Sequence, residues 1–179
     1  MSRMQAVVLT GAPGAGKTAV LEALGARGYA TVGESARTII RDRKNRGLSP
    51  RPEPLEFAQE VFRADVSKYE QARQRSGLVF FDRSAIDALG MLSELGPVSE
   101  LASCLETYRY HHDVFVFPPW AAIYRSDAER DQTFAQAVEV QQRICEWYRH
   151  CQYRLIDVPF ASVAERCDYI VSHLAQSKR

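Results

Sequence analysis

The stretch Gly11-Ala12-Pro13-Gly14-Ala15-Gly16-Lys17-Thr18 decides the fold. It follows an apolar run at residues 5–10, typical of a buried strand, and precedes residues 18–27, where apolar side chains recur at helical spacing. Glycines at such a junction let backbone N–H groups face an anion, because no Cβ obstructs them. The first turn of the following helix adds unpaired N–H groups and the positive end of its dipole. The sequence therefore predicts a phosphate-binding loop between a strand and a helix.

The eight residues match the P-loop pattern GxxxxGK[ST] in full. All of them are expected to contact the nucleotide, with Lys17 reaching the β and γ phosphates and the Thr18 hydroxyl coordinating Mg²⁺. A glycine-rich turn with an incidental lysine is the alternative, and the flanking strand and helix disfavour it. The pattern leaves the choice between ATP and GTP open.

The rest of the chain alternates strand-like and helix-like segments, which predicts a doubly wound α/β sheet. Further strands are expected at residues 29–32, 78–81, 114–117 and 153–158. Helices are expected at residues 33–47, 55–76, 84–95, 99–110, 132–150 and 163–174. We expect residues 1–179 to form a single domain, with a mobile proline-rich loop at about residues 47–54 and a lid at about residues 118–131.

The composition excludes several classes of protein. With 23 basic and 22 acidic residues the net charge is +1, which argues against a dedicated nucleic-acid binder. No apolar run approaches the roughly 18 residues that span a bilayer, and the N-terminus has no signal-peptide pattern, so a cytoplasmic location is expected. The four cysteines form no CxxC pair and are expected to be buried, reduced thiols.

A carboxylate follows the third expected strand, where P-loop proteins keep a second acidic group beside the metal. Asp82 at this point can hold Mg²⁺ or accept a proton from an attacking hydroxyl, although it can also cap the next helix. Arg83 comes directly after it, where motor-type ATPases often have a glutamate that activates water. A basic residue favours phosphoryl transfer to a bound acceptor over hydrolysis, and a surface ion pair is the alternative.

Two further residues are expected at the same edge of the sheet. Glu34 follows the second strand and can orient an acceptor hydroxyl or act as a base, with Arg37 one turn further on. The alternative is a glutamate that stabilises the helix dipole. Asp87 lies three residues after Ser84, which is capping-box spacing, so a structural role is expected for Asp87.

The connection after the fourth strand contains two arginines, Arg125 and Arg130. On a lid that closes over the nucleotide, either can neutralise transition-state charge, whereas a solvated helix with ion pairs is the alternative. Trp120 and Tyr124 are interpreted as core or lid-packing residues rather than base-stacking ones. A basic cluster is interpreted either as a solvated helix face or as a site for an anionic acceptor, a nucleic acid or an acidic lipid; it comprises Arg37, Arg41, Arg43, Lys44, Arg46 and Arg51.

Five segments together resemble the AAA_28 family of ATPases and kinases: GAPGAGKT, GESARTII, VFFDRSAIDALG, VFVFPPWAAIYRSDAER and YRLIDVPFASVAERCDYI. That family is similar to ribosylnicotinamide-kinase domains and, more distantly, to deoxynucleoside and thymidylate kinases. One eukaryotic branch resembles a GTP- and phosphoinositide-binding trafficking factor. The resemblance implies a three-layer α/β/α P-loop NTPase fold with a five-stranded parallel sheet of order 2-3-1-4-5. It also implies nucleotide and Mg²⁺ at residues 11–18, with Asp82 and Arg83 beside them and Arg125 and Arg130 in the lid.

These observations favour an ATP- and Mg²⁺-dependent phosphotransferase that acts on a small, nucleoside-like molecule. The acceptor is expected near Glu34, Arg37 and Arg83, while Lys17 and the lid arginines stabilise developing charge. The alternative is a GTP- or ATP-binding switch or ATPase that recognises a protein or an anionic lipid through the basic cluster. The sequence has no obvious NKxD guanine-specificity motif, which counts against a typical GTPase.

Overall fold

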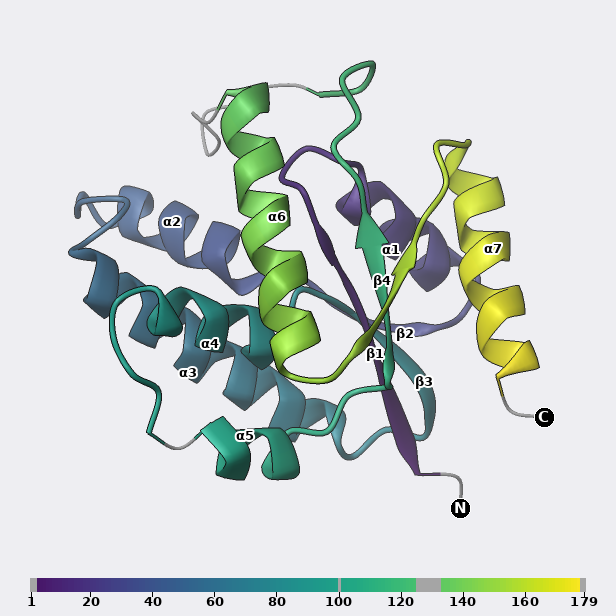
Figure 1. Ribbon diagram of the computed structural model, residues 1–179, viewed down its shortest axis with the longest axis horizontal. Helices are drawn as coiled ribbons and strands as arrows, with labels where there is room; N and C mark the ends of the chain where they lie inside the picture. The colour runs from purple at the N-terminus through teal and green to yellow at the C-terminus, as the bar shows by residue number, and fades with distance from the viewer. Residues whose placement is uncertain (1–2, 100, 125–132, 178–179) are drawn as a thin grey trace.

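A computed structural model describes residues 3–99, 101–124 and 133–177. Its centre is a parallel five-stranded sheet in the order β2-β3-β1-β4-β5 (Figure 1). The strands are β1 (Met4–Gly11), β2 (Ala30–Val32), β3 (Gly77–Asp82), β4 (Asp113–Phe117) and β5 (Arg154–Asp157). The expected strand order and the all-parallel sheet are therefore confirmed.

The helices lie within a few residues of the expected segments. They are α1 (Lys17–Ala26), α2 (Ser35–Asn45), α3 (Pro54–Ala72), α4 (Ala85–Ser93), α5 (Leu101–Thr107), α6 (Phe134–His150) and α7 (Val163–Gln176). Capping boxes fix three N-termini, because Ser84, Thr133 and Ser162 each accept a backbone hydrogen bond at the start of α4, α6 and α7. Pro54 begins α3, where its missing N–H costs no helical hydrogen bond.

Side chains of the central strand alternate between two apolar cores. Val7 and Leu9 pack on the side covered by α1 and α7, whereas Ala6 and Val8 pack on the side covered by α3, α4 and α6. In Figure 1, α7 lies to the right of the sheet and α3 and α4 lie to the left. Because the strand side chains have a period of two, β1 buries both faces and the layers are α/β/α.

The carboxyl ends of three strands meet at one edge of the sheet. Leu9 of β1 is in register with Asp82 of β3, and Val32 of β2 is in register with Phe81. The loop after β1, the end of β3 and the segment after β2 therefore lie side by side. Ligands of open α/β folds bind at this edge.

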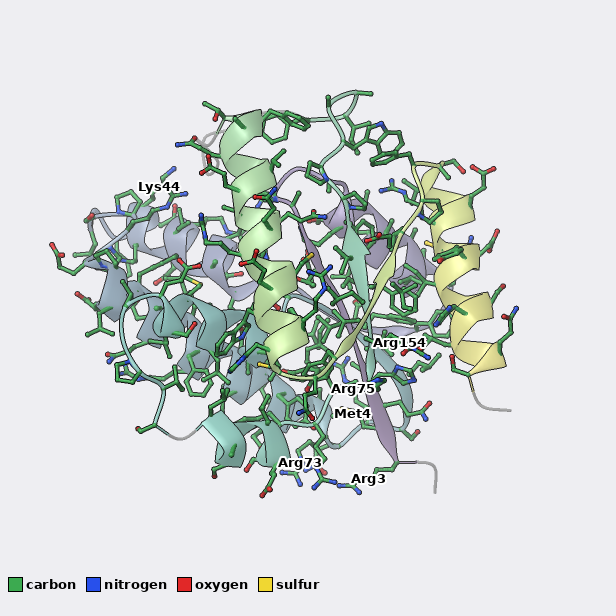
Figure 2. All side chains as sticks on the ribbon, viewed as in Figure 1. Arg3, Met4, Lys44, Arg73, Arg75 and Arg154 are labelled. Atoms are coloured by element: carbon green, nitrogen blue, oxygen red, sulfur yellow. The ribbon has the colours of Figure 1, made fainter. Side chains whose placement is uncertain are left out.

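A charged cluster lies at the opposite end of β4. The buried carboxylate of Asp113 accepts two hydrogen bonds from Arg154 of β5, at 2.5 and 2.7 Å, and also contacts His173 and Ser177 at the end of α7. Figure 2 labels Arg154 beside α7. These contacts tie the last helix to the sheet.

The cysteine expectation was correct for two of the four residues. Cys151 and Cys167 are buried, whereas Cys104 and Cys145 are only partly buried because they lie on the sides of amphipathic helices; all four are free. Residues 47–53 form an almost wholly exposed connection between α2 and α3. Among the described residues, no helix has the length and apolar character needed to cross a membrane.

Candidate functional site

The loop of residues 11–16 leaves β1 at a glycine that no other residue can replace without a clash. Gly11 has φ +119°, and a Cβ there would lie 2.4 Å from the carbonyl oxygen of Phe117 on β4. Gly16 has φ +83°, and a Cβ added to it would lie 2.9 Å from Nη1 of Arg166. That Nη1 donates to the carbonyl of Ala15. The loop is thus held between β4 and an arginine of α7, which the sequence did not single out.

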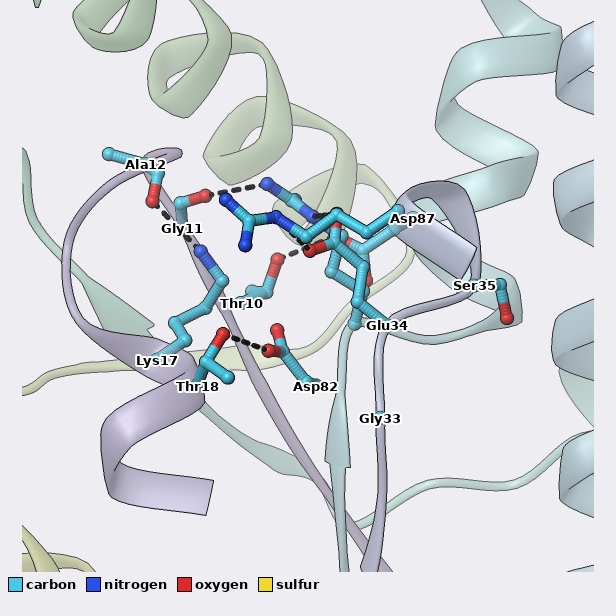
Figure 3. Close-up of polar contacts among 12 residues, drawn as sticks. Thr10, Gly11, Ala12, Lys17, Thr18, Gly33, Glu34, Ser35, Asp82 and Asp87 are labelled. Carbon is cyan, nitrogen blue, oxygen red and sulfur yellow. Dashed lines mark hydrogen bonds and ion pairs between the residues drawn. The ribbon is translucent and has the colours of Figure 1, made fainter. Parts of the chain in front are cut away.

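Lys17 begins α1 and is 6% exposed. Its Nζ donates to the carbonyl of Ala12 at 2.8 Å, so the side chain folds back over the loop (Figure 3). Burial, together with the nearby positive charge of Arg83, lowers the pKa of Lys17 to about 8, although Asp82 and Glu34 oppose this shift. A bound polyphosphate would favour the protonated form of Lys17 and oppose this shift.

Thr18 and Asp82 lie together beneath the loop. The Thr18 hydroxyl donates to Oδ2 of Asp82 at 3.3 Å, and Asp82 is 3% exposed. Among the described residues, Oδ1 of Asp82 is buried and accepts no hydrogen bond. Burial raises the pKa of Asp82, with Lys17 opposing the shift. A hydroxyl beside an unsatisfied carboxylate oxygen fits a hard divalent cation such as Mg²⁺, which prefers oxygen ligands.

Arg83 lies at the centre of the site in an unusual backbone conformation. Its φ is +65°, which non-glycine residues rarely adopt and which is common at functional sites. Its guanidinium contacts the carbonyl of Gly11 at 3.2 Å, Glu34 at 3.4 Å and Asp87 at 3.3 Å. Burial disfavours the charge, but these carboxylates outweigh it and raise the pKa of Arg83. Arg83 therefore links the P-loop to the segment after β2.

Glu34 is expected to contact the acceptor, and it lies near Asp87, across the site from Lys17 (Figure 3). Its carboxylate is held by Arg83 on one side and by Arg37 at 3.7 Å on the other. Its side chain is 19% exposed, so part of it remains accessible to a ligand. The structure thus brings together Lys17, Thr18 and Asp82 with Glu34, Arg37 and Arg83, although these come from three separate segments.

Asp87 has a larger role than helix capping. The expected capping box with Ser84 is present. Asp87 also accepts hydrogen bonds from Thr10 at 2.5 Å and from Tyr148 of α6 at 2.6 Å, in addition to its contact with Arg83. Sequence spacing signals only the contact with Ser84, because Thr10 and Tyr148 lie more than sixty residues away.

A cleft of about 1030 Å³ opens from the P-loop between two helical walls. One wall comes from α2 and α3, including Ile40, Phe57, Val61 and Asp65, and the other comes from α4 and α6, including Met91 and Trp147. Glu34, Arg37 and Arg83 border the cleft beside Lys17 and Thr18. Drug-sized ligands occupy pockets of roughly 300–1,000 Å³. The cleft is therefore large enough for a small molecule beside the P-loop.

The lid arginines Arg125 and Arg130 lie outside the described residues. Before that segment, Trp120 packs against Phe160 with ring centroids 5.1 Å apart, and the Arg166 guanidinium lies 5.5 Å from the Trp120 ring. Tyr124 packs edge-on against Phe134 of α6. These contacts agree with the packing role expected for the two aromatic residues.

The basic cluster is in part neutralised by neighbouring acids. Arg43 pairs with Glu60 at 2.8 Å, and Arg46 pairs with Asp42 at 3.4 Å. Figure 2 shows Lys44 of this cluster far from Arg3 and Arg73, which lie near the N-terminal end of the sheet. Of the basic side chains labelled in Figure 2, only Lys44 belongs to this cluster, and it lies apart from the others.

The site has a glycine-rich loop between a buried strand and a helix, a buried lysine, and a carboxylate at the end of the neighbouring strand β3. These features define a P-loop nucleotide-binding domain. The model of the AAA_28 family, described as an AAA domain, matches residues 6–166, so the chain belongs to this family. No curated protein is significantly similar in sequence.

Several solved structures that share this fold are named as small-molecule kinases. A deoxyadenosine kinase from M. mycoides, with dCMP and a flexible dCDP bound, is similar with a TM-score of 0.69 and 13% identity over 96% of this chain and 100% of that one. A thymidylate kinase from Ehrlichia chaffeensis has a TM-score of 0.62 and 13% identity over 96% of this chain and 99% of that one. A shikimate kinase from Acinetobacter baumannii, in complex with shikimate, has a TM-score of 0.57 and 15% identity over 98% of this chain and 95% of that one. At these identities the likeness establishes the nucleotide-kinase-like fold.

Proposed function

We propose that this protein is a kinase that transfers the γ-phosphoryl group of ATP or GTP to a hydroxyl of a small, nucleoside-like molecule. One observation supports this proposal above the others: a cleft of about 1030 Å³ begins at the P-loop and is bordered there by Glu34. A nucleotide hydrolase needs room only for water beside the γ phosphate. The kinases with the same fold act on small molecules, as the names of deoxyadenosine, thymidylate and shikimate kinase state.

The amides of residues 11–18 and the Lys17 ammonium group bind the β and γ phosphates in the proposed reaction. Lys17 exchanges its hydrogen bond with the Ala12 carbonyl, 2.8 Å long, for the phosphate oxygens. Thr18 and Asp82 hold Mg²⁺, which neutralises charge on the phosphates when it is bound. The buried Oδ1 of Asp82, which has no partner among the described residues, supports this role, because an orphaned carboxylate oxygen is costly unless a cation or water satisfies it.

Glu34 positions the acceptor hydroxyl and takes its proton. The acceptor oxygen forms a bond to the γ phosphorus as the bond to the bridging oxygen breaks, and the nucleoside diphosphate leaves with the electron pair. Arg83, between Glu34 and the P-loop carbonyl of Gly11, stabilises charge on the transferred group. Arg37 supports the Glu34 carboxylate from the other side.

We further propose that residues 1–179 act as one domain, with a mobile loop at about residues 47–54 and a lid at about residues 118–131, of which residues 125–131 lie outside the described residues. Arg125 and Arg130 would then stabilise transition-state charge, as lid arginines do in related chemistry. The alternative function, a nucleotide switch that binds an anionic lipid through the basic cluster, has weaker support. Arg43 and Arg46 of that cluster already pair with acids.

Product analysis tests the kinase proposal directly. The protein is incubated with ATP or GTP, Mg²⁺ and a panel of nucleosides and related hydroxyl compounds, and phosphorylated products are identified by mass spectrometry. Thermal shift measurements with and without Mg²⁺ report nucleotide binding separately. We expect one or more nucleosides to be phosphorylated, and hydrolysis without any phosphorylated product from the panel would contradict the proposal.

A Glu34→Gln variant tests the assigned base. Its nucleotide-induced thermal shift should remain, while phosphoryl transfer should fall by about 100-fold or more, since general-base contributions are typically 10²–10⁴-fold. Asp42→Asn is the matched control, because this exposed carboxylate on α2 contacts only Arg46 among the ion pairs of the described residues. Equal turnover by Glu34→Gln and the control would remove Glu34 from the reaction.

A further inference from the structure

The cleft contains a buried carboxylate that the proposed reaction does not use. Asp65 lies on α3, is 7% exposed and borders the cleft. Its Oδ1 accepts a hydrogen bond from Ser35 at 2.5 Å. Within the described part of the chain, its second oxygen, Oδ2, accepts no hydrogen bond. Oδ2 is also not fully buried. The carboxylate therefore keeps acceptor capacity on the side that borders the cleft.

Asp65 is coupled by its position to the proposed reaction centre. Its partner Ser35 directly follows Glu34 and begins α2. The hydrogen bond thus ties Asp65 to the residue that follows Glu34, whose side chain we propose binds the reacting hydroxyl. Both Glu34 and Asp65 border the cleft, so a ligand whose hydroxyl contacts Glu34 can extend towards Asp65.

The charged groups around Glu34 and Asp65 favour an uncharged acceptor; Arg51 and Arg143 also border the cleft, and Arg143 pairs with Glu94 at 3.0 Å. The Arg83 guanidinium is already paired with Glu34 and Asp87, and Arg37 is paired with Glu34. An acceptor that already carries a phosphate group would bring that phosphate close to the Asp65 carboxylate. The neighbouring arginines, Arg37 and Arg83, are already neutralised by carboxylates. Like charges at short range disfavour such a ligand. The neighbouring cleft residues Ile40, Phe57 and Val61 are apolar and suit a flat or apolar part of the acceptor.

We propose that Asp65 is a specificity-determining residue of the acceptor site, whose carboxylate accepts a hydrogen bond from an O–H or N–H group of an uncharged acceptor. This proposal rests on the proposed function and narrows its substrate class. The protein takes molecules with a second hydrogen-bond donor, such as nucleosides, and discriminates against their monophosphates. An acceptor that lacks the donor leaves the buried carboxylate unpaired, which weakens binding strongly.

The protonation state of Asp65 adds a second signature. Burial raises the pKa of Asp65 to about 7, although the Ser35 hydrogen bond opposes the shift. The charged groups that face it are Glu34 before α2, Asp87 on α4 and Lys68 on α3, and the Tyr110 phenol before β4 also lies close. The ionised carboxylate accepts the stronger hydrogen bond. The KM for the acceptor should therefore fall as the pH rises through about 7.

Steady-state kinetics of Asp65→Asn test the proposal. The amide keeps the size of the side chain and can still accept from Ser35, so the fold and the ATP-induced thermal shift should be retained. With the best nucleoside of the panel, KM should rise about 10- to 100-fold with a smaller change in kcat, as expected for a lost charged hydrogen bond. The dependence of KM on pH near 7 should disappear. Glu70→Gln is the matched control, because this α3 carboxylate pairs with Arg73 at the exposed surface.

Calorimetry with the protein loaded with a non-hydrolysable ATP analogue separates the two proposals. Nucleosides, the same nucleosides without a sugar hydroxyl or an exocyclic amine, and their 5′-monophosphates are titrated into wild type and Asp65→Asn. If nucleosides bind without being phosphorylated, and the variant loses this binding, the kinase proposal fails while the role of Asp65 stands. If the variant keeps the wild-type KM, pH profile and preference for nucleosides over monophosphates, the role of Asp65 is refuted while the kinase proposal stands. Absence of any binding by the panel refutes both.

Discussion

The lowered pKa of Lys17 predicts how nucleotide affinity depends on pH. Burial and Arg83 lower this pKa to about 8, so Lys17 is largely protonated at pH 7 and largely neutral at pH 9. If only the ammonium form binds the phosphates, the dissociation constant scales with 1 + 10^(pH − pKa). That factor is about 1.1 at pH 7 and about 11 at pH 9, so affinity should fall about tenfold, or about 1.4 kcal/mol.

Isothermal titration calorimetry with Mg²⁺ and a non-hydrolysable ATP analogue, at intervals between pH 7 and pH 9, measures this slope. Lys17→Met is the reference, because its side chain has no proton to lose. Ionisation of the analogue and of other groups affects both proteins alike, so the difference between the two profiles isolates Lys17. Parallel profiles for wild type and Lys17→Met would refute the assignment of Lys17 as the phosphate-binding ammonium group with a lowered pKa.

Three other perturbations test the metal site, the P-loop backbone and the cluster at the far end of the sheet. Asp82→Asn should weaken Mg²⁺-dependent nucleotide binding about 10- to 100-fold in calorimetry. Its melting temperature in the absence of nucleotide should be unchanged. Unaltered Mg²⁺ dependence of binding would contradict the proposed metal site. Gly11→Ala should lower the free energy of unfolding in urea by about 2 kcal/mol or more, because its Cβ would lie 2.4 Å from the Phe117 carbonyl oxygen; a wild-type midpoint would count against the clash. Asp113→Asn should cost about 1–3 kcal/mol at pH 7. Hydrogen bonds from Arg154 lower the pKa of Asp113, so its stabilisation is present above the unfolded-state pKa of about 4 and is lost as the pH falls further; the difference between wild type and variant should shrink below about pH 4.

The local elements could be predicted from the sequence because their signals are local. The run at residues 78–81 is apolar and bounded by Gly77 and Asp82, and the structure has β3 at Gly77–Asp82. The expected helix at residues 99–110 was the least accurate, because α5 covers only Leu101–Thr107. A short helix with few buried side chains has a weak periodic pattern, so its ends are poorly defined.

The candidate site was predictable only in part. Lys17, Thr18, Asp82 and Glu34 follow from their places after strands, because parallel strands end at one edge of the sheet. Asp65 was not predicted, because a carboxylate in the middle of a long amphipathic helix has the same pattern as a solvated one. Its burial depends on Ser35, thirty residues earlier in the chain.

The sequence by itself determined that a strand, a phosphate-binding loop and a helix follow one another at residues 5–27, since glycine spacing and hydrophobic period are properties of neighbouring residues. Only the tertiary structure decided which side chains from distant segments share one site. It joined Arg83 to both Glu34 and Gly11 and joined Asp87 to Thr10 and Tyr148. Within the described ranges of the chain, it left one oxygen of Asp82 without a partner. Such contacts depend on how helices pack on the two faces of the sheet, and no local pattern specifies them.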